Sequence, residues 1–400
     1  MPPKTTQNLA VLVVGLACAA PLSAAAAAAP PAPPAPLSRV VFNASFSAAT
    51  GARCLDGSAS GFYWRAGDPR RFVVFLEGGG ACWSFATCAA RAKTALGSSA
   101  FWPATMTDGD NVLSSDPAVS AFASWSAVFV PYCGGDVHLG TRRSVVDPQA
   151  FPLFFSGHLT VGAVLELLKA EHGLGAAAEL LLSGASAGGI GSIINSDFVA
   201  DALPGVAVKA APQAPWFFPP VVNYSAWQAS PNAGPPFAGQ DTPINALWQA
   251  YETPACVAAK GAGFCGSVNF AFPFLRTPMH VSQDLEDSNM LFAQLGVPPD
   301  NSTAARAYTS PYFQGAMVAG LAQIARAGDA VWAPGCVAHT ENLNLLSPTT
   351  VRGVSMKQSL DSWYFGGNAA PRLVDACVGV NCGAGCPSSV DARHEPWLRY

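Results

Sequence analysis

The stretch "LLSGASAGGIG", residues 181–191, leads from an apolar run into a serine that has only alanine and glycine beside it. Residues 184–188 match the pattern G-x-S-x-G, in which a nucleophilic serine sits on a sharp turn between a strand and a helix. The helix that follows crowds the flanks of this turn, so only very small residues fit there. Because an apolar run precedes the pattern and a helical segment follows it, we predict that Ser186 is a nucleophile.

Five apolar segments predict the strands of the fold. The first three are apolar at nearly every position, which is typical of strands buried on both faces of a parallel sheet. The five segments are "RFVVFLEGGG" (71–80), "WSAVFVPYCGG" (125–135), "AELLLSGAS" (178–186), "VAVKA" (206–210) and "PMHVSQ" (278–283).

Two segments between these strands have apolar residues at helical spacing. They are "LTVGAVLELLKAEHG" (159–173), which stops at glycine, and "GIGSIINSDFVADALPG" (189–205), which we expect to end before Pro204. Strands that alternate with helices predict an α/β fold with a mainly parallel central sheet flanked by helices.

The N-terminus has the features of a signal peptide. Lys4 precedes the apolar run "LAVLVVGLACAAPL" (9–22), and small residues follow it. We predict a signal peptide at 1–29, a Pro/Ala-rich linker at 30–38 and one α/β domain at 39–400. The apolar run is short for a bilayer, so we expect secretion without stable membrane insertion; a membrane anchor or a disordered tail are the alternatives.

The charge pattern excludes some partners. Only 12% of the 400 residues are charged, the net charge is −4, and no basic run is present. We therefore expect no nucleic-acid partner, and we expect a monomer.

Ten cysteines lie beyond the predicted signal peptide, an even number that predicts up to five disulfides in a secreted chain. The C-terminal "CVGVNCGAGC" lacks the paired spacing and the histidine of a metal site, so we predict no metal. Three sequons begin at Asn43, Asn223 and Asn301 and agree with secretion.

A nucleophilic serine needs a base, and the base needs a carboxylate that orients it. In this architecture the acid and then the histidine follow the serine along the chain. His339 lies in a loop beside Cys336, which could hold it in place. Asp284, Glu286 and Asp287 all follow the strand at 278–283, and the residues alone do not choose among them.

Backbone N–H groups must also stabilise the oxyanion of acyl transfer. Gly78, Gly79 and Gly80 end a predicted strand in a loop that resembles the glycine loops of esterases. A phosphate-binding loop is the alternative, but the lysine and the serine or threonine that it requires are absent.

The segment 212–243 carries eight prolines among aromatic residues, which include Trp216 and Phe217. It follows a strand that should end at the edge of the sheet where ligands bind. We expect either a loop pinned over the core or a Pro/aromatic-rich cap that walls a substrate cleft.

Together, "LEGGGACW", "VPYCGGDVHLG", "LSGASAGG" and "GCVAHTENLN" resemble the pectin acetylesterase family, which also contains the animal carboxylesterase Notum. The resemblance implies an α/β-hydrolase fold and ester hydrolysis by a Ser-Asp-His triad without a metal or cofactor. The sequence also departs from the family's pattern, because it has Gly80 and Ala81 where family members often carry a bulky aromatic residue.

The resemblance assigns the triad to Ser186, Asp287 and His339, where the spacing from Gln283 favours Asp287. It assigns the oxyanion hole to the N–H groups of Gly79, Gly80 and Ala187, and it places Asp136 near the site. We predict that Asp136, Trp216 and Phe217 contact the substrate.

The implied substrate is an O-acetylated polysaccharide such as pectin, in the extracellular space or cell wall. The alternatives are removal of a long acyl chain from a secreted protein, and a carbohydrate-binding relative without activity.

Overall fold

The computed structural model describes residues 36–146, 151–217, 247–295, 297, 303–366 and 372–387, together with Met1 and Pro3. Apart from Met1 and Pro3, the predicted signal peptide lies outside this part, as do residues 30–35 of the linker, residues 218–243 of the expected cap and the sequons at Asn223 and Asn301. Strand β1 begins at Leu37, two residues before the predicted start of the domain at residue 39. The division into signal peptide, linker and one domain stays a prediction.

The described strands form a ten-stranded sheet in the order β14-β11-β10-β9-β8-β3-β5-β2-β1-β4. Neighbours from β14 to β5 are parallel, and β2, β1 and β4 continue the sheet in antiparallel pairing. The mainly parallel sheet is therefore confirmed. The ten strands are β1 (Leu37–Val41), β2 (Gly61–Arg65), β3 (Asp68–Leu76), β4 (Thr105–Met106), β5 (Trp125–Val130), β8 (Glu179–Ala185), β9 (Ala207–Gln213), β10 (His280–Ser282), β11 (Ala330–Ala333) and β14 (Arg372–Val374).

Two small hairpins and the helices complete the described elements. The hairpins pair β6 (Arg142–Val146) with β7 (Leu153–Phe155) and β12 (Thr350–Val351) with β13 (Val354–Ser355). The helices are α1 (Ala44–Thr50), α2 (Phe85–Arg91), α3 (Gly157–Glu171), α4 (Ala187–Ile194), α5 (Ser196–Ala202), α7 (Pro254–Lys260), α8 (Val268–Ala271), α9 (Thr303–Ala307), α10 (Gln314–Leu321) and α11 (Met356–Phe365). Short 3₁₀ and π turns are Ser99–Phe101, Leu174–Ala176, Phe272–Phe274, Asn289–Gln294, Tyr308–Phe313 and Glu341–Leu343.

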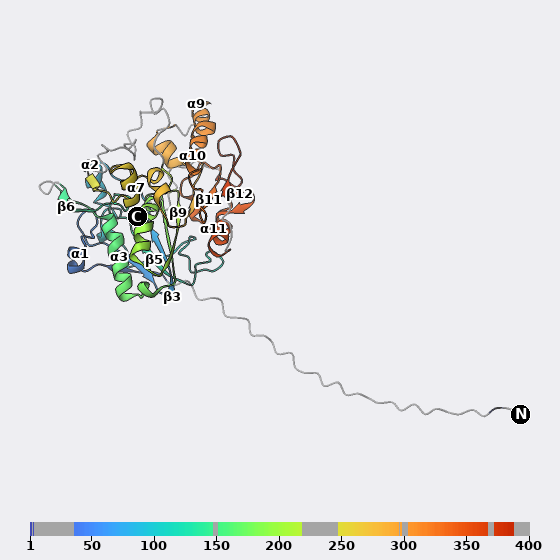
Figure 1. Ribbon diagram of the computed structural model, residues 1–400, viewed down its shortest axis with the longest axis horizontal. Coiled ribbons are helices and arrows are strands. Elements are labelled where there is room, and N and C mark those ends of the chain that lie inside the picture. Colours follow the sequence, from blue (N-terminus) through green and yellow to red (C-terminus); the bar gives the residue numbers. More distant parts are fainter. Residues whose placement is uncertain are drawn as a thin grey trace. The chain divides into compact units, whose positions relative to one another are not determined.

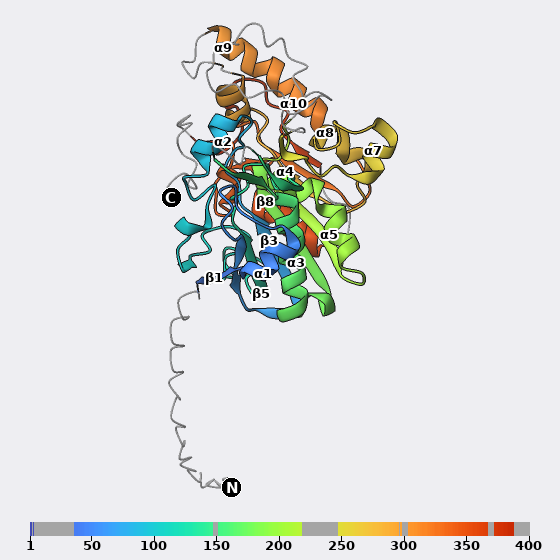
Figure 2. The same ribbon diagram turned by 90° about the vertical axis from the view of Figure 1, so that its left-hand side faces the viewer.

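The central strands are buried on both faces because alternate side chains point to opposite sides of the sheet. Val74 and Leu182 pack in the core that includes α3, α4 and α5, whereas Val73 and Leu181 pack in the core that includes α11. Figure 1 shows α3 and α11 on opposite sides of these strands, and Figure 2 shows α3 and α5 side by side next to β8. This arrangement explains why these strands are apolar at every position.

The helix predicted at 189–205 is two helices that meet at Asn195. Its side-chain Nδ2 donates to the carbonyl of Gly191 at 2.8 Å and to that of His138 at 3.1 Å. An asparagine side chain that bonds nearby backbone groups competes with the regular helical pattern. Asn195 thereby ends α4 and ties it to the loop after β5.

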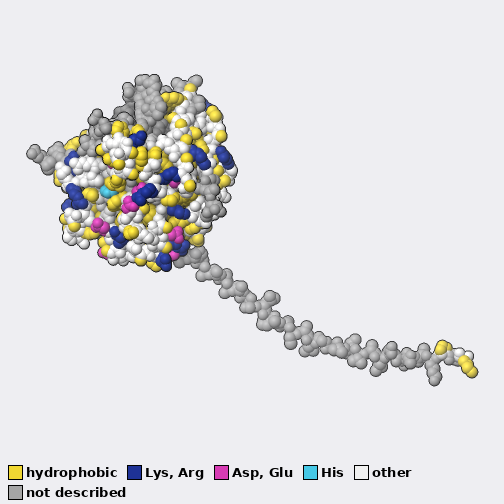
Figure 3. All heavy atoms as spheres, in the orientation of Figure 1, with side chains coloured by type: hydrophobic (Ala, Val, Ile, Leu, Met, Phe, Trp, Pro, Cys, Tyr) yellow, Lys and Arg dark blue, Asp and Glu magenta, His cyan; other side chains and the backbone are white. Residues whose placement is uncertain are grey.

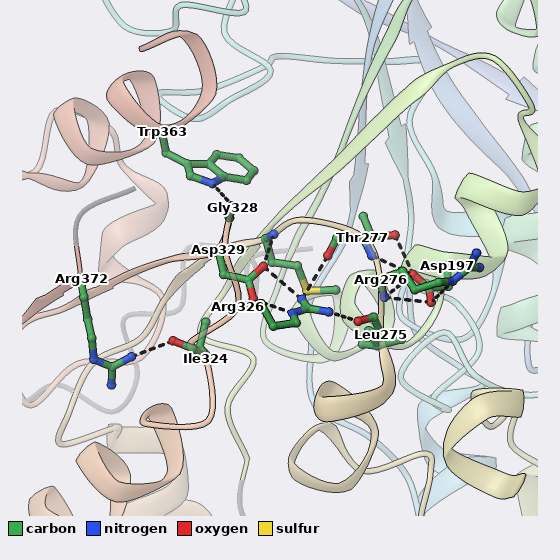
Figure 4. A network of polar contacts seen from close by, with 11 residues as sticks. Asp197, Leu275, Arg276, Thr277, Ile324, Arg326, Gly328, Asp329, Trp363 and Arg372 are labelled. Atoms are coloured by element: carbon green, nitrogen blue, oxygen red, sulfur yellow. Dashed lines mark hydrogen bonds and ion pairs between the residues drawn. The ribbon is translucent and has the colours of Figure 1, made fainter. Parts of the chain in front are cut away.

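A polar network binds the segment before β10 to the segment before β11 (Figure 4). Arg326 donates to Asp329 and to the carbonyls of Leu275 and Thr277, and Asp329 accepts the N–H of Met279 at 3.0 Å. The guanidinium of Arg326 also lies over the ring of Phe272, with 4.6 Å between Cζ and the ring centroid. The network fixes the amino ends of two strands whose carboxyl ends lead to the predicted acid and base.

All ten predicted cysteines are paired, which confirms the disulfides. Because the C-terminal cysteines are oxidised in these pairs, their sulfurs are not metal ligands. The pairs are Cys54–Cys133, Cys82–Cys88, Cys256–Cys265, Cys336–Cys386 and Cys377–Cys382.

On the face that Figure 3 shows, the basic and acidic side chains of the described residues lie interspersed and do not gather into a patch of one charge. Within the described ranges, no helix combines the length and the apolar character that crossing a membrane requires.

Candidate active site

Ser186 lies on the turn between β8 and α4 with φ 53° and ψ −117°, a conformation that L-residues rarely adopt. Its N–H donates to the carbonyl of Gln213 at 2.9 Å. A Cβ on Gly184 would lie 2.3 Å from the oxygen of Gly188, and one on Gly188 would lie 2.0 Å from that of Leu76. Close backbone contacts therefore require glycine on both sides of the serine.

His339 lies in the loop after β11, and its side chain is buried beside Ser186. The Nε2 atom is 2.8 Å from Ser186 Oγ, although 153 residues separate the two in the chain. The disulfide Cys336–Cys386 fastens the loop three residues before the histidine. The imidazole is therefore held within hydrogen-bond distance of the serine hydroxyl.

Asp287 contacts the other nitrogen of this imidazole, with 2.7 Å between its Oδ2 and His339 Nδ1. Gln283 Nε2 donates to the same oxygen at 2.8 Å, and the N–H of Met290 donates to Oδ1 at 3.0 Å. These donors fix the carboxylate in one orientation, so the structure brings Ser186, His339 and Asp287 into one hydrogen-bonded chain.

Among the three carboxylates that the residues left open, Asp287 is the one that meets the imidazole. Glu286 turns the other way, and its Oε2 accepts the N–H of Asn381 at 2.7 Å. Burial raises the pKa of Glu286 to about 7. Asp284 is buried as well.

The loop that carries Asp287 runs alongside the loop that carries His339, because the parallel pairing of β10 with β11 continues past the ends of the strands. Four backbone hydrogen bonds join the two loops and set the two side chains opposite each other. The donor and acceptor pairs are Gln283–Trp332 at 3.0 Å, Leu285–Pro334 at 2.9 Å, Glu286–Cys336 at 3.3 Å and Ser288–Ala338 at 3.0 Å.

The glycine loop after β3 lies against the serine turn. A Cβ on Gly78 would be 3.3 Å from the Cβ of Ser186, and Gly79 and Gly80 adopt φ values of 132° and 68°. Ala187 is the first residue of α4. In the described part of the chain, the N–H groups of Gly79, Gly80 and Ala187 donate no hydrogen bond, so all three remain available for an oxyanion.

Arg91, at the end of α2, holds one peptide of this loop. Its Nη1 donates to the carbonyl of Gly79 at 2.8 Å, its Nε donates to that of Leu96 at 2.9 Å, and its Cζ lies 4.7 Å from the ring centroid of Tyr132. The C=O and N–H of a trans peptide point in opposite directions. Arg91 therefore fixes the N–H of Gly80 on the side away from the guanidinium.

Of the two aromatic residues predicted to contact substrate, only Phe217 lies at the site. Its ring meets the ring of His339 edge to face, with 5.7 Å between centroids. Trp216 is fully buried and packs on Phe272, and its backbone N–H donates to Gln283 Oε1 at 2.8 Å. A side chain without exposed surface has none to offer a substrate, so Trp216 is a core residue that supports Gln283.

Asp136 is likewise fully buried, which corrects its assignment as a substrate contact. Its Oδ2 accepts the N–H of Gly157 at 2.8 Å, and a Cβ on Gly134, Gly140 or Gly157 would come within 2.5 Å of the carboxylate. Burial raises the pKa of Asp136 to about 6. The side chain ties the loop after β5 to the start of α3.

Two residues of the site were missed from the sequence. Gln283 bridges Asp287 and Trp216, and the spacing from Gln283 to Asp287 was the only signal for it. Arg91 had no signal, because its contact depends on where the disulfide Cys82–Cys88 places α2.

The sequence matches the Pectinacetylesterase family over residues 39–387, a range that contains all three side chains of the hydrogen-bonded chain. The chain belongs to the pectinacetylesterase family. This confirms the resemblance, and it agrees with the predicted class of carboxylic ester hydrolase.

Relatives within the pectinacetylesterase family carry two kinds of name. Pectin acetylesterase 5 from Arabidopsis thaliana is 37% identical over 178 residues, which cover 43% of this chain and 41% of that protein. Palmitoleoyl-protein carboxylesterase NOTUM from Mus musculus is 30% identical over 383 residues, which cover 86% of this chain and 71% of that protein. In four of these relatives, among them Pectin acetylesterase 5, the part that matches this chain spans less than half of the relative's length.

A solved structure of the Wnt deacylase Notum from Drosophila superposes with a TM-score of 0.76 and 25% identity, covering 88% of this chain and 100% of that one. A second crystal form gives a TM-score of 0.73 and 26% identity, with 88% and 99% covered. The α/β-hydrolase-like fold of this pectinacetylesterase family member is therefore confirmed.

Proposed function

We propose that this chain is a secreted serine carboxylesterase that uses Ser186, His339 and Asp287 as its catalytic triad. The observation that carries the proposal is the pair of hydrogen bonds, 2.8 Å and 2.7 Å long, that joins the three side chains. The connection from serine through imidazole to carboxylate is the geometry that activates a neutral hydroxyl.

In the proposed mechanism, His339 Nε2 takes the proton of Ser186 as Oγ attacks the ester carbonyl. Asp287 holds Nδ1–H and stabilises the imidazolium that forms. The imidazolium then returns the proton to the leaving alkoxide, which departs as the alcohol and leaves an acyl-serine. A water molecule, deprotonated by His339, attacks this ester, and the acid leaves as Ser186 regains its proton.

The negative charge of each tetrahedral intermediate falls on the former carbonyl oxygen. We assign the N–H groups of Gly79, Gly80 and Ala187 as its donors. Each such donor is worth about 10²–10³-fold in kcat where it has been measured. The N-terminal end of α4 adds a favourable dipole at the same place.

We propose an O-acetylated polysaccharide such as pectin as the substrate. The support is the 37% identity with an enzyme named pectin acetylesterase and the space beside the loop, since a Cβ on Gly80 would have no atom of the described residues within 4 Å. That space gives room for a bulky alcohol such as a sugar chain. Five disulfides agree with an extracellular or cell-wall location.

Removal of a long acyl chain from a secreted protein is the second candidate. It is favoured by the structural similarity to a Wnt deacylase over 88% of this chain. Phe217, which lies against His339, would then contact the acyl chain.

The deciding experiment compares p-nitrophenyl acetate, p-nitrophenyl palmitate and acetylated pectin as substrates. The Ser186→Ala variant should lose at least about 10³-fold in kcat. The matched control is Ser192→Ala in α4, and it should retain activity. Among the described residues, the hydroxyl of Ser192 bonds only the carbonyl of Gly189. A higher kcat/KM for the C16 ester than for the C2 ester would favour the second candidate.

Labelling with a fluorophosphonate gives an independent readout of the nucleophile. The probe should modify Ser186 and stop turnover. An unmodified Ser186 together with binding of the polysaccharide would show a carbohydrate-binding relative without activity.

A further inference from the structure

A cavity of about 190 Å³ lies at the carboxyl ends of β3 and β5, and none of the triad or oxyanion residues is among its described lining. Four of the eleven described lining residues are aromatic, namely Tyr63, Phe101, Trp102 and Phe129. An engineered apolar cavity of about 150 Å³ is known to hold benzene. The volume here therefore suits one or two fused aromatic rings.

The polar atoms of two of these aromatic side chains already bond to the protein itself. The hydroxyl of Tyr63 donates to the carbonyl of Pro103 at 2.8 Å, and Nε1 of Trp102 donates to that of Ala95 at 3.3 Å. A ligand in the cavity would therefore meet Tyr63 and Trp102 as aromatic surfaces whose polar atoms are already bonded.

Glu77 is the ionisable residue of the lining, and only 8% of it is exposed. Its Oε2 accepts the N–H of Tyr132 at 2.7 Å, whereas Oε1 has no hydrogen-bond partner among the described residues. Its backbone carbonyl contacts Nε2 of His138 at 2.9 Å, which fixes the residue in place. Burial raises the pKa of Glu77 to about 7. A buried carboxyl group with one unused oxygen at the cavity is built to receive a hydrogen-bond donor.

We propose that this cavity binds a small, uncharged, planar aromatic molecule that carries one N–H or O–H group, with the donor directed to Glu77. The rings of Tyr63, Trp102 and Phe129 would contact the ligand through stacked and edge-to-face arrangements. The site is separate from Ser186, so the proposal does not depend on the esterase chemistry.

The test uses indole as the probe and calorimetric titration of protein whose Ser186 has been replaced by alanine. We expect saturable binding of one indole per chain, with the same affinity in the wild-type protein. Replacing indole by 1-methylindole, which lacks the N–H donor, should weaken binding at least 10-fold. Equal affinities for the two probes, or no saturable binding, would overturn the proposal.

Two variants that fill the cavity test its location. Ala95→Trp and Met106→Trp each place an indole side chain in the lining and should abolish binding. The control is Ala100→Trp, an exposed position next to Phe101 that is not part of the lining, and it should bind as the wild type does. If both variants fold and still bind indole with the wild-type affinity, the probe binds elsewhere. That result would refute the assignment of the binding site to this cavity.

Discussion

One oxygen of Asp287 serves two donors at once, the imidazole of His339 and the amide of Gln283. Because Gln283 is also fixed by the N–H of Trp216, the carboxylate cannot turn without breaking a bond in the core. The orientation of the imidazole is thus set by buried residues that no substrate touches.

Arg91 should control the rate through the peptide it holds. In Arg91→Met, the carbonyl of Gly79 loses its donor, so the N–H of Gly80 is no longer fixed toward the oxyanion. We expect kcat to fall by about 10²-fold, as for the loss of one donor, with KM nearly unchanged. Steady-state kinetics on p-nitrophenyl acetate measures both, and Lys93→Met, an exposed change two residues away, is the control. A change in KM alone would contradict this role.

Glu286 should make stability depend on pH. Burial disfavours the charged form of Glu286 and raises its pKa in the folded state to about 7, against 4.5 for a solvent-exposed glutamate. The folded state therefore keeps a proton that the unfolded chain releases between pH 4.5 and 7. The stability that Glu286 contributes is present below pH 4.5 and is lost as pH rises through about 7.

Thermal melts of Glu286→Gln and wild type from pH 4 to pH 8 measure this effect. The amide is neutral throughout and still accepts the N–H of Asn381. The Tm of the variant should therefore rise relative to that of the wild type as the pH increases to about 7. Above this pH the difference between the two Tm values should stay constant. A constant difference across this range would contradict the raised pKa.

At the scale of elements, the acid and base are positioned from both ends of the same two strands. Backbone bonds join the loops that follow β10 and β11, and the network around Arg326 joins the segments that precede them (Figure 4). The register of this strand pair therefore sets the contact between Asp287 and His339.

Removing Arg326 should destabilise the fold strongly. The side chain of Asp329 is only 2% exposed, so Arg326→Met leaves a buried carboxylate without its partner. Such a loss costs about 3–5 kcal/mol. Urea unfolding measures the change. The control is Lys357→Met, which breaks a more exposed pair with Asp361 on α11 and should cost no more than about 1 kcal/mol. Equal losses would show that the network is not central.

The sequence predicted those elements whose cause is local. Apolar runs marked the central strands, and small residues at Gly184 and Gly188 marked the serine turn. The break at Asn195 was missed because it depends on a carbonyl 57 residues away. Asp136 and Trp216 were assigned to the substrate because the sequence does not show that both are fully buried.

For the molecule as a whole, the disulfides divide into two kinds. Cys54–Cys133 and Cys336–Cys386 link residues 79 and 50 positions apart, whereas the other three close loops of fewer than ten residues. Long loops lose more entropy when they are closed, so these two should contribute most to stability.

The double variant Cys336→Ser/Cys386→Ser should therefore lose about 4 kcal/mol of stability and also lower kcat, because the loop of His339 is released. The double variant Cys256→Ser/Cys265→Ser should lose about 2.5 kcal/mol and keep its kcat. Urea unfolding and initial rates at a temperature where both variants are folded measure the two effects. An unaltered kcat in the first variant would show that the loop is held without the disulfide.

The bond between Cys336 and Cys386 also has a consequence for biosynthesis. A ribosome synthesises β8, Ser186 and the loop of Asp287 long before it reaches Cys386, so the nascent chain lacks this support for His339 until Cys386 has been made and oxidised. If the three side chains act as the proposed triad, full activity therefore requires oxidation of this cysteine pair after its synthesis, and a reducing environment should delay it.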